Sequence, residues 1–196
     1  MTASEPEAIR VAFLVIDALE KLAIPYHVGG SYASSVHGIP RQTQDIDFVI
    51  DLSLEQIPAL TASAGEDFHV DSGAAERAVV RRSSFNLIHR PSGVKVDLFI
   101  RKHSPFDDSE FTRSIPVRLL GAGDREVLVK SAEDTVLRKL LWYRMGGGVS
   151  DRQVSDVRGI LQIQGDRIDL EYLKHWAARL DLSDMLNRLL TDGGKP

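Results

Sequence analysis

The sequence has 196 residues, of which 43% are hydrophobic and 27% are charged, and its formal net charge is −4. A chain of this length and composition can bury a substantial core, and its acidic balance argues against a protein that coats nucleic acid non-specifically. It contains no cysteine, which excludes disulfides, thiolate metal sites and a cysteine nucleophile.

The ends and apolar runs of the sequence indicate where the protein works. Residues 1–7 lack the basic start and apolar stretch of a signal peptide. No apolar run approaches the roughly eighteen residues that a membrane helix needs. We therefore expect a cytoplasmic protein without a membrane segment.

The first two thirds of the chain alternate helical and strand patterns. Apolar residues recur at helical spacing over 6–22, behind a capping box formed by Ser4 and Glu7. The further elements that we predict are a strand at 26–30, a helix at 31–37, a strand at 45–51, a helix at 54–64, a strand at 68–71, a hairpin of 84–89 and 94–100, and short strands at 115–120 and 126–129.

After Ser131 the pattern becomes helical. We predict helices from Ser131 to about 145, from Ser150 to about 162, over 169–180 and over 184–191. The glycines at 146–148 interrupt the first two and do not form a P-loop, because no strand precedes them and no lysine–serine pair follows. The sequence thus predicts an α/β (α+β) fold, with a mixed sheet flanked by helices in residues 1–130 and a helical C-terminal lobe in residues 131–196.

Two carboxylates mark the predicted strand at 45–51. Its apolar residues and carboxylates alternate at period two, so Asp45 and Asp47 share one face while Ile46, Phe48 and Ile50 point into a core. Paired carboxylates on an apolar strand suit hard divalent cations. The alternative is that they lie at an exposed strand end and cap neighbouring N–H groups.

A glycine turn precedes this strand. Residues 24–28 form an apolar strand that ends in two glycines, and Ser31 opens the next helix. Free N–H groups and the helix dipole at such a turn favour phosphate. Gly30 would allow close backbone approach and Ser31 would donate a hydroxyl; a simple strand-ending turn is the alternative.

Together, Gly30-Ser31 and Asp45-x-Asp47 resemble the signature of the nucleotidyltransferase superfamily related to DNA polymerase beta. Arg41-x-Thr43 and His37-Gly38 resemble its bacterial branch of toxin–antitoxin nucleotidyltransferases. The resemblance implies a third carboxylate on a later strand, which Asp97 matches; a solvated strand face is the alternative. It also implies nucleotide contacts at Arg41, Thr43 and Lys139, or at Arg138 in place of Lys139, with Asp156 as a loosely matched acidic partner.

This resemblance implies two-metal phosphoryl chemistry. Two Mg²⁺ ions held by Asp45, Asp47 and Asp97 would bind an NTP such as ATP. The nucleoside monophosphate of this NTP would then be transferred to a hydroxyl group. The acceptor can be an RNA 3′ end, a protein side chain or a small molecule, and a cognate antitoxin or toxin is an expected partner.

Residues 77–118 hold nine Lys or Arg against four Asp or Glu, which favours RNA or protein as the acceptor. A hairpin with a basic solvent face is the alternative, because aromatic residues for base stacking are sparse there.

The rival functions are a catalytically inert nucleotide-binding or interaction module of the same fold and a metal-dependent phosphatase. The phosphatase is disfavoured because its nucleophilic aspartate would end an apolar strand, whereas Asp45 begins one.

Overall fold

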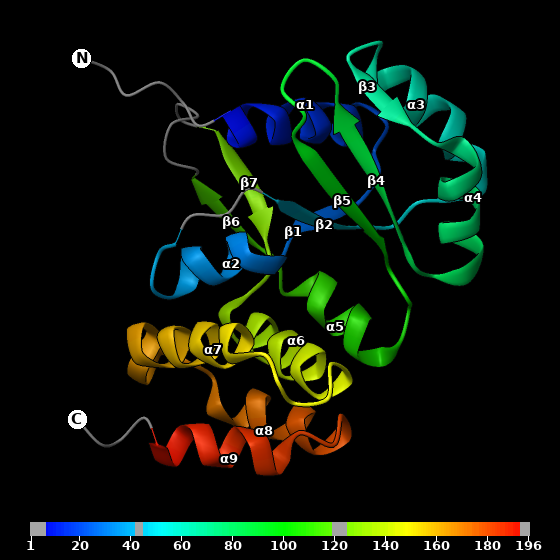
Figure 1. The fold of residues 1–196 in the computed structure, drawn as a ribbon. Coiled ribbons are helices and arrows are strands. Elements are labelled where there is room, and N and C mark those ends of the chain that lie inside the picture. The colour runs from blue at the N-terminus through cyan, green and yellow to red at the C-terminus, as the bar shows by residue number, and fades with distance from the viewer. Residues whose placement is uncertain (1–6, 42–44, 119–124, 193–196) are drawn as a thin grey trace, which may run out of the picture. The chain divides into compact units, whose positions relative to one another are not determined.

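The computed structural model describes residues 7–41, 45–118 and 125–192 (Figure 1). The predicted cap residue Ser4 and the predicted nucleotide contact Thr43 lie outside these ranges. The chain divides into two compact units, one from Met1–Gly29 and Thr43–Val129 and the other from Gly30–Gln42 and Lys130–Pro196. The sequence-based division at residue 131 assigns residues 30–42 to the first part, whereas the structure groups them with the C-terminal helices.

The first unit is built on a mixed sheet whose strand order is β3-β4-β5-β2-β1-β7-β6. Strands β2 and β5 are parallel, as are β1 and β7, and the other neighbours are antiparallel. The strands predicted at 26–30 and 45–51 are neighbours in this sheet. The strands are β1 (Tyr26–Val28), β2 (Ile46–Ile50), β3 (Phe68–Val70), β4 (Ser84–His89), β5 (Lys95–Ile100), β6 (Ile115–Arg118) and β7 (Glu126–Val129).

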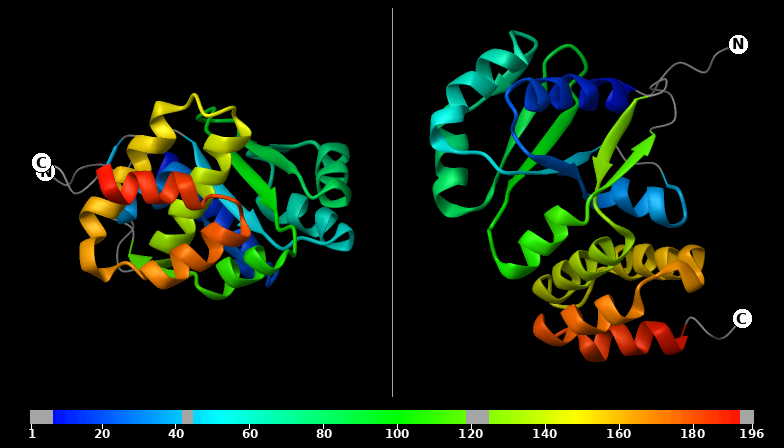
Figure 2. Two further views of the ribbon diagram at one scale, coloured as in Figure 1. Left: turned by 90° about the horizontal axis from the view of Figure 1, so that it is seen from below. Right: turned by 180° about the vertical axis from the view of Figure 1, so that it is seen from behind.

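One face of this sheet carries the apolar core. Ile46, Phe48 and Ile50 alternate along β2 with at most 3% of their surface exposed. Helix α3 packs against α1 and α4, and α4 packs against β4 and β5. The course of α1 can be followed in Figure 2. These elements are α1 (Glu7–Lys21), a 3₁₀ turn (Leu54–Gln56), α3 (Ile57–Ala64) and α4 (Ser72–Arg81).

Two helices of this unit were not predicted from the sequence. Helix α4 begins at Asp71, whose Oδ1 accepts a hydrogen bond from the backbone N–H of Ala74 at 2.9 Å. Helix α5 (Pro105–Thr112) begins with a capping box between Ser104 and Asp107. Helix α5 has a weak helical pattern, so its cap was the available signal. Helix α4 buries Ala75, Ala78 and Val79 at helical spacing, so both its pattern and its cap could have revealed it.

The second unit is helical and contains α2 (Gly30–His37), α6 (Ala132–Met145), α7 (Asp151–Gln164), α8 (Leu170–Arg179) and α9 (Ser183–Asp192). Helix α2 packs against α6 and α7. Two glycines allow this close packing. A Cβ on Gly38 would lie 2.8 Å from the backbone nitrogen of Ile160, and a Cβ on Gly159 would lie 3.3 Å from the backbone nitrogen of Ile39. The buried ring of His37 makes a hydrogen bond of 2.7 Å with the carbonyl of Lys130, and burial lowers its pKa.

Candidate active site

The carboxylates predicted to bind metal lie on the face of the sheet opposite the core. In the register of β2 and β5, Asp47 stands directly beside Asp97, so their Cα atoms are about 4.8 Å apart, the spacing of neighbouring strands. Asn86 of β4 continues the same row. Asp45 precedes β2 by one residue and is exposed. The later strand on which Asp97 was expected is therefore the direct neighbour of the strand of Asp47.

A lysine neutralises part of this negative charge. Lys95 shares the face of Asp97, and its Nζ lies 2.8 Å from Asp97 Oδ2. The pKa of Lys95 is raised, first by its hydrogen bond to Asp97 and further by the charges of Asp97, Asp45 and Asp47. All three carboxylates therefore act on one cation.

The three carboxylates are the kind of ligand that binds a divalent metal ion. Carboxylate oxygens are the ligands that Mg²⁺ prefers. The three carboxylates already stabilise one cation, the ammonium group of Lys95. In the described part of the chain, however, no three Asp, Glu or His side chains gather closely enough to hold an ion by themselves. Additional oxygens, such as those of a triphosphate, would have to complete the coordination.

The predicted phosphate turn belongs to the second unit. Gly30 opens α2 with a φ of +55°, a left-handed conformation that glycine adopts without steric cost. It follows Gly29, whose N–H donates a hydrogen bond of 2.8 Å to the carbonyl of Asp47. The chain thus passes from a residue paired with Asp47 directly into the N-terminus of α2, where Ser31 is the second residue.

A cluster of charged side chains joins α2, α6 and α7. Arg41 Nε lies 3.0 Å from Asp156 Oδ1, and Lys139 Nζ lies 2.6 Å from Asp156 Oδ2. Arg41 Nη2 also donates a hydrogen bond to Ser31 Oγ. The side chains of Lys139 and Asp156 are each 7% exposed, and that of Arg41 is 29% exposed. Two cations therefore share one carboxylate in a largely buried site.

The cluster combines two cationic side chains with one carboxylate. Burial by itself would raise the pKa of Asp156, but hydrogen bonds from Arg41 and Lys139, together with their charges, outweigh burial and lower it. Asp156 is therefore ionised and balances one of the two cations. Arginine and lysine side chains are also the groups that bind phosphate through charge-assisted hydrogen bonds.

Sequence reasoning underestimated this cluster. A lysine on an amphipathic helix is usually solvated, whereas Lys139 is buried. Arg41 and Asp156 are separated by 115 positions, so no local pattern could pair them. The signal that remained was the resemblance, which singled out Arg41 and Lys139 and left the role of Asp156 open.

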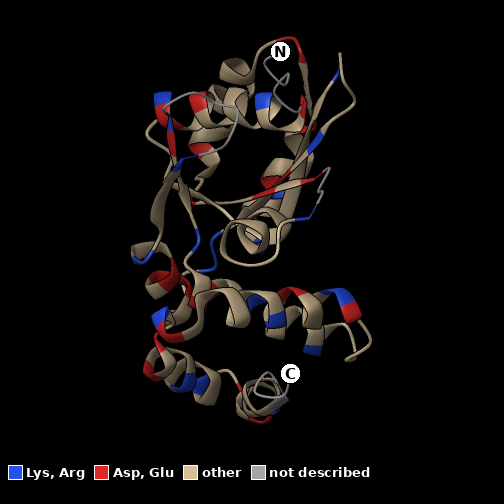
Figure 3. Cartoon of the chain, turned by 90° about the vertical axis from the view of Figure 1, so that its left-hand side faces the viewer, with Lys and Arg blue, Asp and Glu red and all other residues tan. Residues whose placement is uncertain are grey.

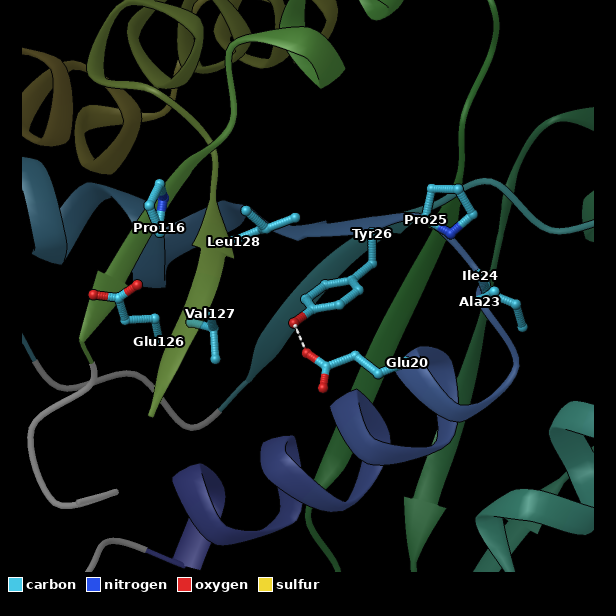
Figure 4. Close-up of a pocket in the computed structure, with 9 residues that line it drawn as sticks. All are labelled: Glu20, Ala23, Ile24, Pro25, Tyr26, Pro116, Glu126, Val127 and Leu128. Carbon is cyan, nitrogen blue, oxygen red and sulfur yellow. Dashed lines mark hydrogen bonds between the residues drawn. The ribbon is translucent and has the colours of Figure 1, made fainter. Parts of the chain in front are cut away.

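A pocket elsewhere in the first unit contains none of these residues. It lies between the end of α1, the start of β1 and strands β6 and β7, and its lining is mostly apolar (Figure 4). Inside it, the hydroxyl of Tyr26 donates a hydrogen bond of 2.8 Å to Glu20, and burial raises the tyrosine pKa. This pocket is unrelated to the predicted site.

Several cations of residues 77–118 are exposed, and others form ion pairs. Of the cations in residues 77–118, Arg101 is engaged by Asp51 and Asp108, and Lys95 by Asp97. The side chains of Arg81, Arg82, Arg90 and Lys102 are exposed. In the second unit, by contrast, Lys and Arg are interspersed with Asp and Glu along the helices (Figure 3).

With this geometry established, the family of the chain can be assigned. A family model described as Nucleotidyl transferase AbiEii toxin, type IV TA system, matches residues 26–190. The chain belongs to this family. It is a nucleotidyltransferase, as the resemblance implied, and the match includes Gly30-Ser31, the carboxylates, Lys139 and Asp156.

Solved structures agree on the fold. The antibiotic-resistance factor ANT(2″)-Ia is similar with a TM-score of 0.53 at 12% identity, over 92% of this chain and 96% of that one. Its complex with adenylyl-2″-tobramycin gives a TM-score of 0.51 at 12% identity, over 88% and 97%. An antigenic nucleotidyltransferase-like protein from Paracoccidioides brasiliensis gives 0.53 at 20% identity, over 96% and 95%. The predicted nucleotidyltransferase fold is confirmed.

Two further comparisons complete this description. No curated protein matches the chain by sequence. Among the described helices, none has both the length and the apolar composition that a membrane crossing requires.

Proposed function

We propose that the protein transfers a nucleoside monophosphate from an NTP to a hydroxyl acceptor in a Mg²⁺-dependent reaction. Asp45, Asp47 and Asp97 would hold the metal ions. The observation that carries the proposal is the register that sets Asp47 beside Asp97, because carboxylates on adjacent strands can offer their oxygens to the same divalent cation. The triphosphate would be bound by Gly30, Ser31, Arg41, Thr43 and Lys139.

Each group of residues has its own task. The buried Lys139 and the partly buried Arg41, both paired with Asp156, would bind and orient the phosphates. The first turn of α2 would donate backbone N–H groups to the phosphates. Asp97 Oδ would accept the proton of the acceptor hydroxyl. When bound, the divalent ions would polarise the acceptor oxygen and neutralise charge on the leaving pyrophosphate.

The acceptor is proposed to be an RNA 3′ end or a protein side chain, with the protein acting in the cytoplasm as the toxin of a toxin–antitoxin pair. The family supports the toxin role and an antitoxin partner. The exposed cations Arg81, Arg82, Arg90 and Lys102 support a polyanionic acceptor, because they would repel a polycation. The adenylyl-tobramycin bound by ANT(2″)-Ia is for this reason a less suitable guide to the acceptor here.

The test is to incubate the pure protein with Mg²⁺, each α-labelled NTP, and total RNA or lysate, and to identify the labelled fraction. Asp47→Asn should lower transfer by at least about a hundredfold, because a carboxamide is a poor ligand for a hard cation. Asp71→Asn is the matched control. This exposed residue caps α4, asparagine caps equally well, and transfer should be unchanged.

Full transfer by Asp47→Asn would refute the assignment of the carboxylates. Wild-type protein that labels no acceptor with any NTP, and gains no thermal stability from Mg²⁺ with NTP, would identify an inert nucleotide-binding or interaction module instead.

A further inference from the structure

We call Arg41, Lys139 and Asp156 the phosphate cluster, because the proposed function assigns the triphosphate to it. On the helix pair α6–α7, two residues that have no role in the proposed reaction lie next to this cluster. The helices are antiparallel, since Gln164 at the end of α7 and Lys130 at the start of α6 both bond to His37. Lys139 on α6 contacts Asp156 on α7 at 2.6 Å. One turn nearer the connecting loop are Trp142 and Gln153, each three residues from that ion pair. Residues three apart on a helix share a face, so this pair flanks the phosphate cluster.

Trp142 presents an aromatic surface at this position. Its side chain is 51% exposed, whereas the other tryptophan of the chain, Trp176, is 8% exposed. Stacking on an exposed aromatic ring is a general way to bind a nucleobase, because every base offers a π-face. The indole lies one turn beyond Lys139 on α6, about 5 Å along the helix axis.

Gln153 supplies a polar group that lacks a partner. Its Oε1 is buried and accepts no hydrogen bond in the described part of the chain. A buried acceptor without a donor is costly, and native structures usually satisfy it with protein, water or ligand. The exocyclic amino group of adenine, cytosine or guanine would provide the missing N–H donor, whereas uracil carries a carbonyl oxygen at the matching position of cytosine.

We propose that Trp142 and Gln153 form the nucleobase subsite of this nucleotidyltransferase. The base stacks on the indole of Trp142, and Gln153 Oε1 accepts a hydrogen bond from its exocyclic amine. The subsite therefore selects an NTP with an amino-bearing base over UTP. This inference rests on the proposed function, because it assumes that Lys139 and Arg41 hold the triphosphate.

The test measures binding rather than turnover. Tryptophan fluorescence of the whole protein is titrated with CTP, UTP and inorganic tripolyphosphate in the presence of Mg²⁺. CTP should quench the fluorescence and bind about tenfold tighter than UTP, while tripolyphosphate binds with little quenching. For variants that lose the signal, affinity is measured by calorimetry.

The variants separate the two roles. Trp142→Ala should weaken CTP binding about tenfold or more and leave tripolyphosphate binding unchanged, while Trp142→Phe retains most of the affinity. Gln153→Ala should bring the CTP-to-UTP ratio close to one, and Gln153→Glu, which keeps an acceptor, should preserve the preference. Ile163→Ala is the control, since its side chain is 48% exposed and it lies ten residues along α7 from Gln153.

Wild-type affinity of Trp142→Ala for CTP would overturn the stacking role, and an unchanged CTP-to-UTP ratio in Gln153→Ala would overturn the role of Gln153. The failure of the proposed function gives a different result. In that case tripolyphosphate does not bind the wild type, or Lys139→Met binds it equally well, and the nucleobase subsite is refuted together with the phosphate site.

Discussion

Asp156→Asn should destabilise the protein, although it changes almost no volume. The wild-type carboxylate balances Lys139 and Arg41, and the side chains of Lys139 and Asp156 are each 7% exposed. The amide keeps a hydrogen-bond acceptor but removes the charge, so two cations remain close together in a poorly hydrated site. Removing one partner of a buried ion pair typically costs about 3–5 kcal/mol. For a chain of this size that corresponds to a fall in Tm of about 6–20 °C.

The pH dependence of this loss gives a second measurement. The pKa of Asp156 is lowered in the folded protein, so its contribution is complete above its ordinary pKa of about 4 and is lost as the pH falls through the lower, folded value. The difference in unfolding free energy between wild type and Asp156→Asn should therefore be constant from pH 7 to about pH 5. It should shrink below about pH 4.

Urea and thermal unfolding followed by circular dichroism would measure both effects. Because the variant lacks its internal anion, tripolyphosphate should raise its Tm by more than it raises that of the wild type. A Tm within about 2 °C of the wild type at pH 7 would refute the reasoning, since it would mean that water hydrates the two cations without cost.

Three further predictions follow from other parts of the fold. Without divalent metal, Asp47→Asn should leave Tm unchanged or raise it by up to about 3 °C, because it removes repulsion from Asp97; calorimetry with and without Mg²⁺ and NTP would check this, and a large loss of stability would contradict it. Gly38→Ala should cost about 1–3 kcal/mol, because its Cβ would lie 2.8 Å from the backbone of Ile160, whereas Gly73→Ala in α4 meets the flexible end of an arginine and should be neutral or stabilising in the same urea assay. The lowered pKa of His37 makes the folded protein favour the neutral ring, so stability should decrease as the pH falls below about 6.5, and His37→Gln should flatten that dependence in unfolding curves between pH 5 and 8.

Much of the fold was predictable because its signals are local. The period-two alternation of β2 predicted which of its residues face the core and which lie on the opposite face with Asp47. The caps at Ser131 and Asp169 marked the starts of α6 and α8, where each side chain accepts a backbone hydrogen bond. Helix α5 was missed because short helices gain most of their stability from tertiary packing, which a local pattern does not reveal.

The sequence by itself determined the chemistry that is available: the paired carboxylates, the glycine–serine turn and the resemblance that identified the nucleotidyltransferase family. Tertiary structure alone decided two things. It placed Asp97 beside Asp47, because strand order and register depend on packing between distant segments. It also brought Arg41, Lys139 and Asp156 into one buried cluster. The charge of each residue can be read from the sequence. The free-energy cost of burying that charge, and the group that it binds, depend on neighbours that only the folded protein brings together.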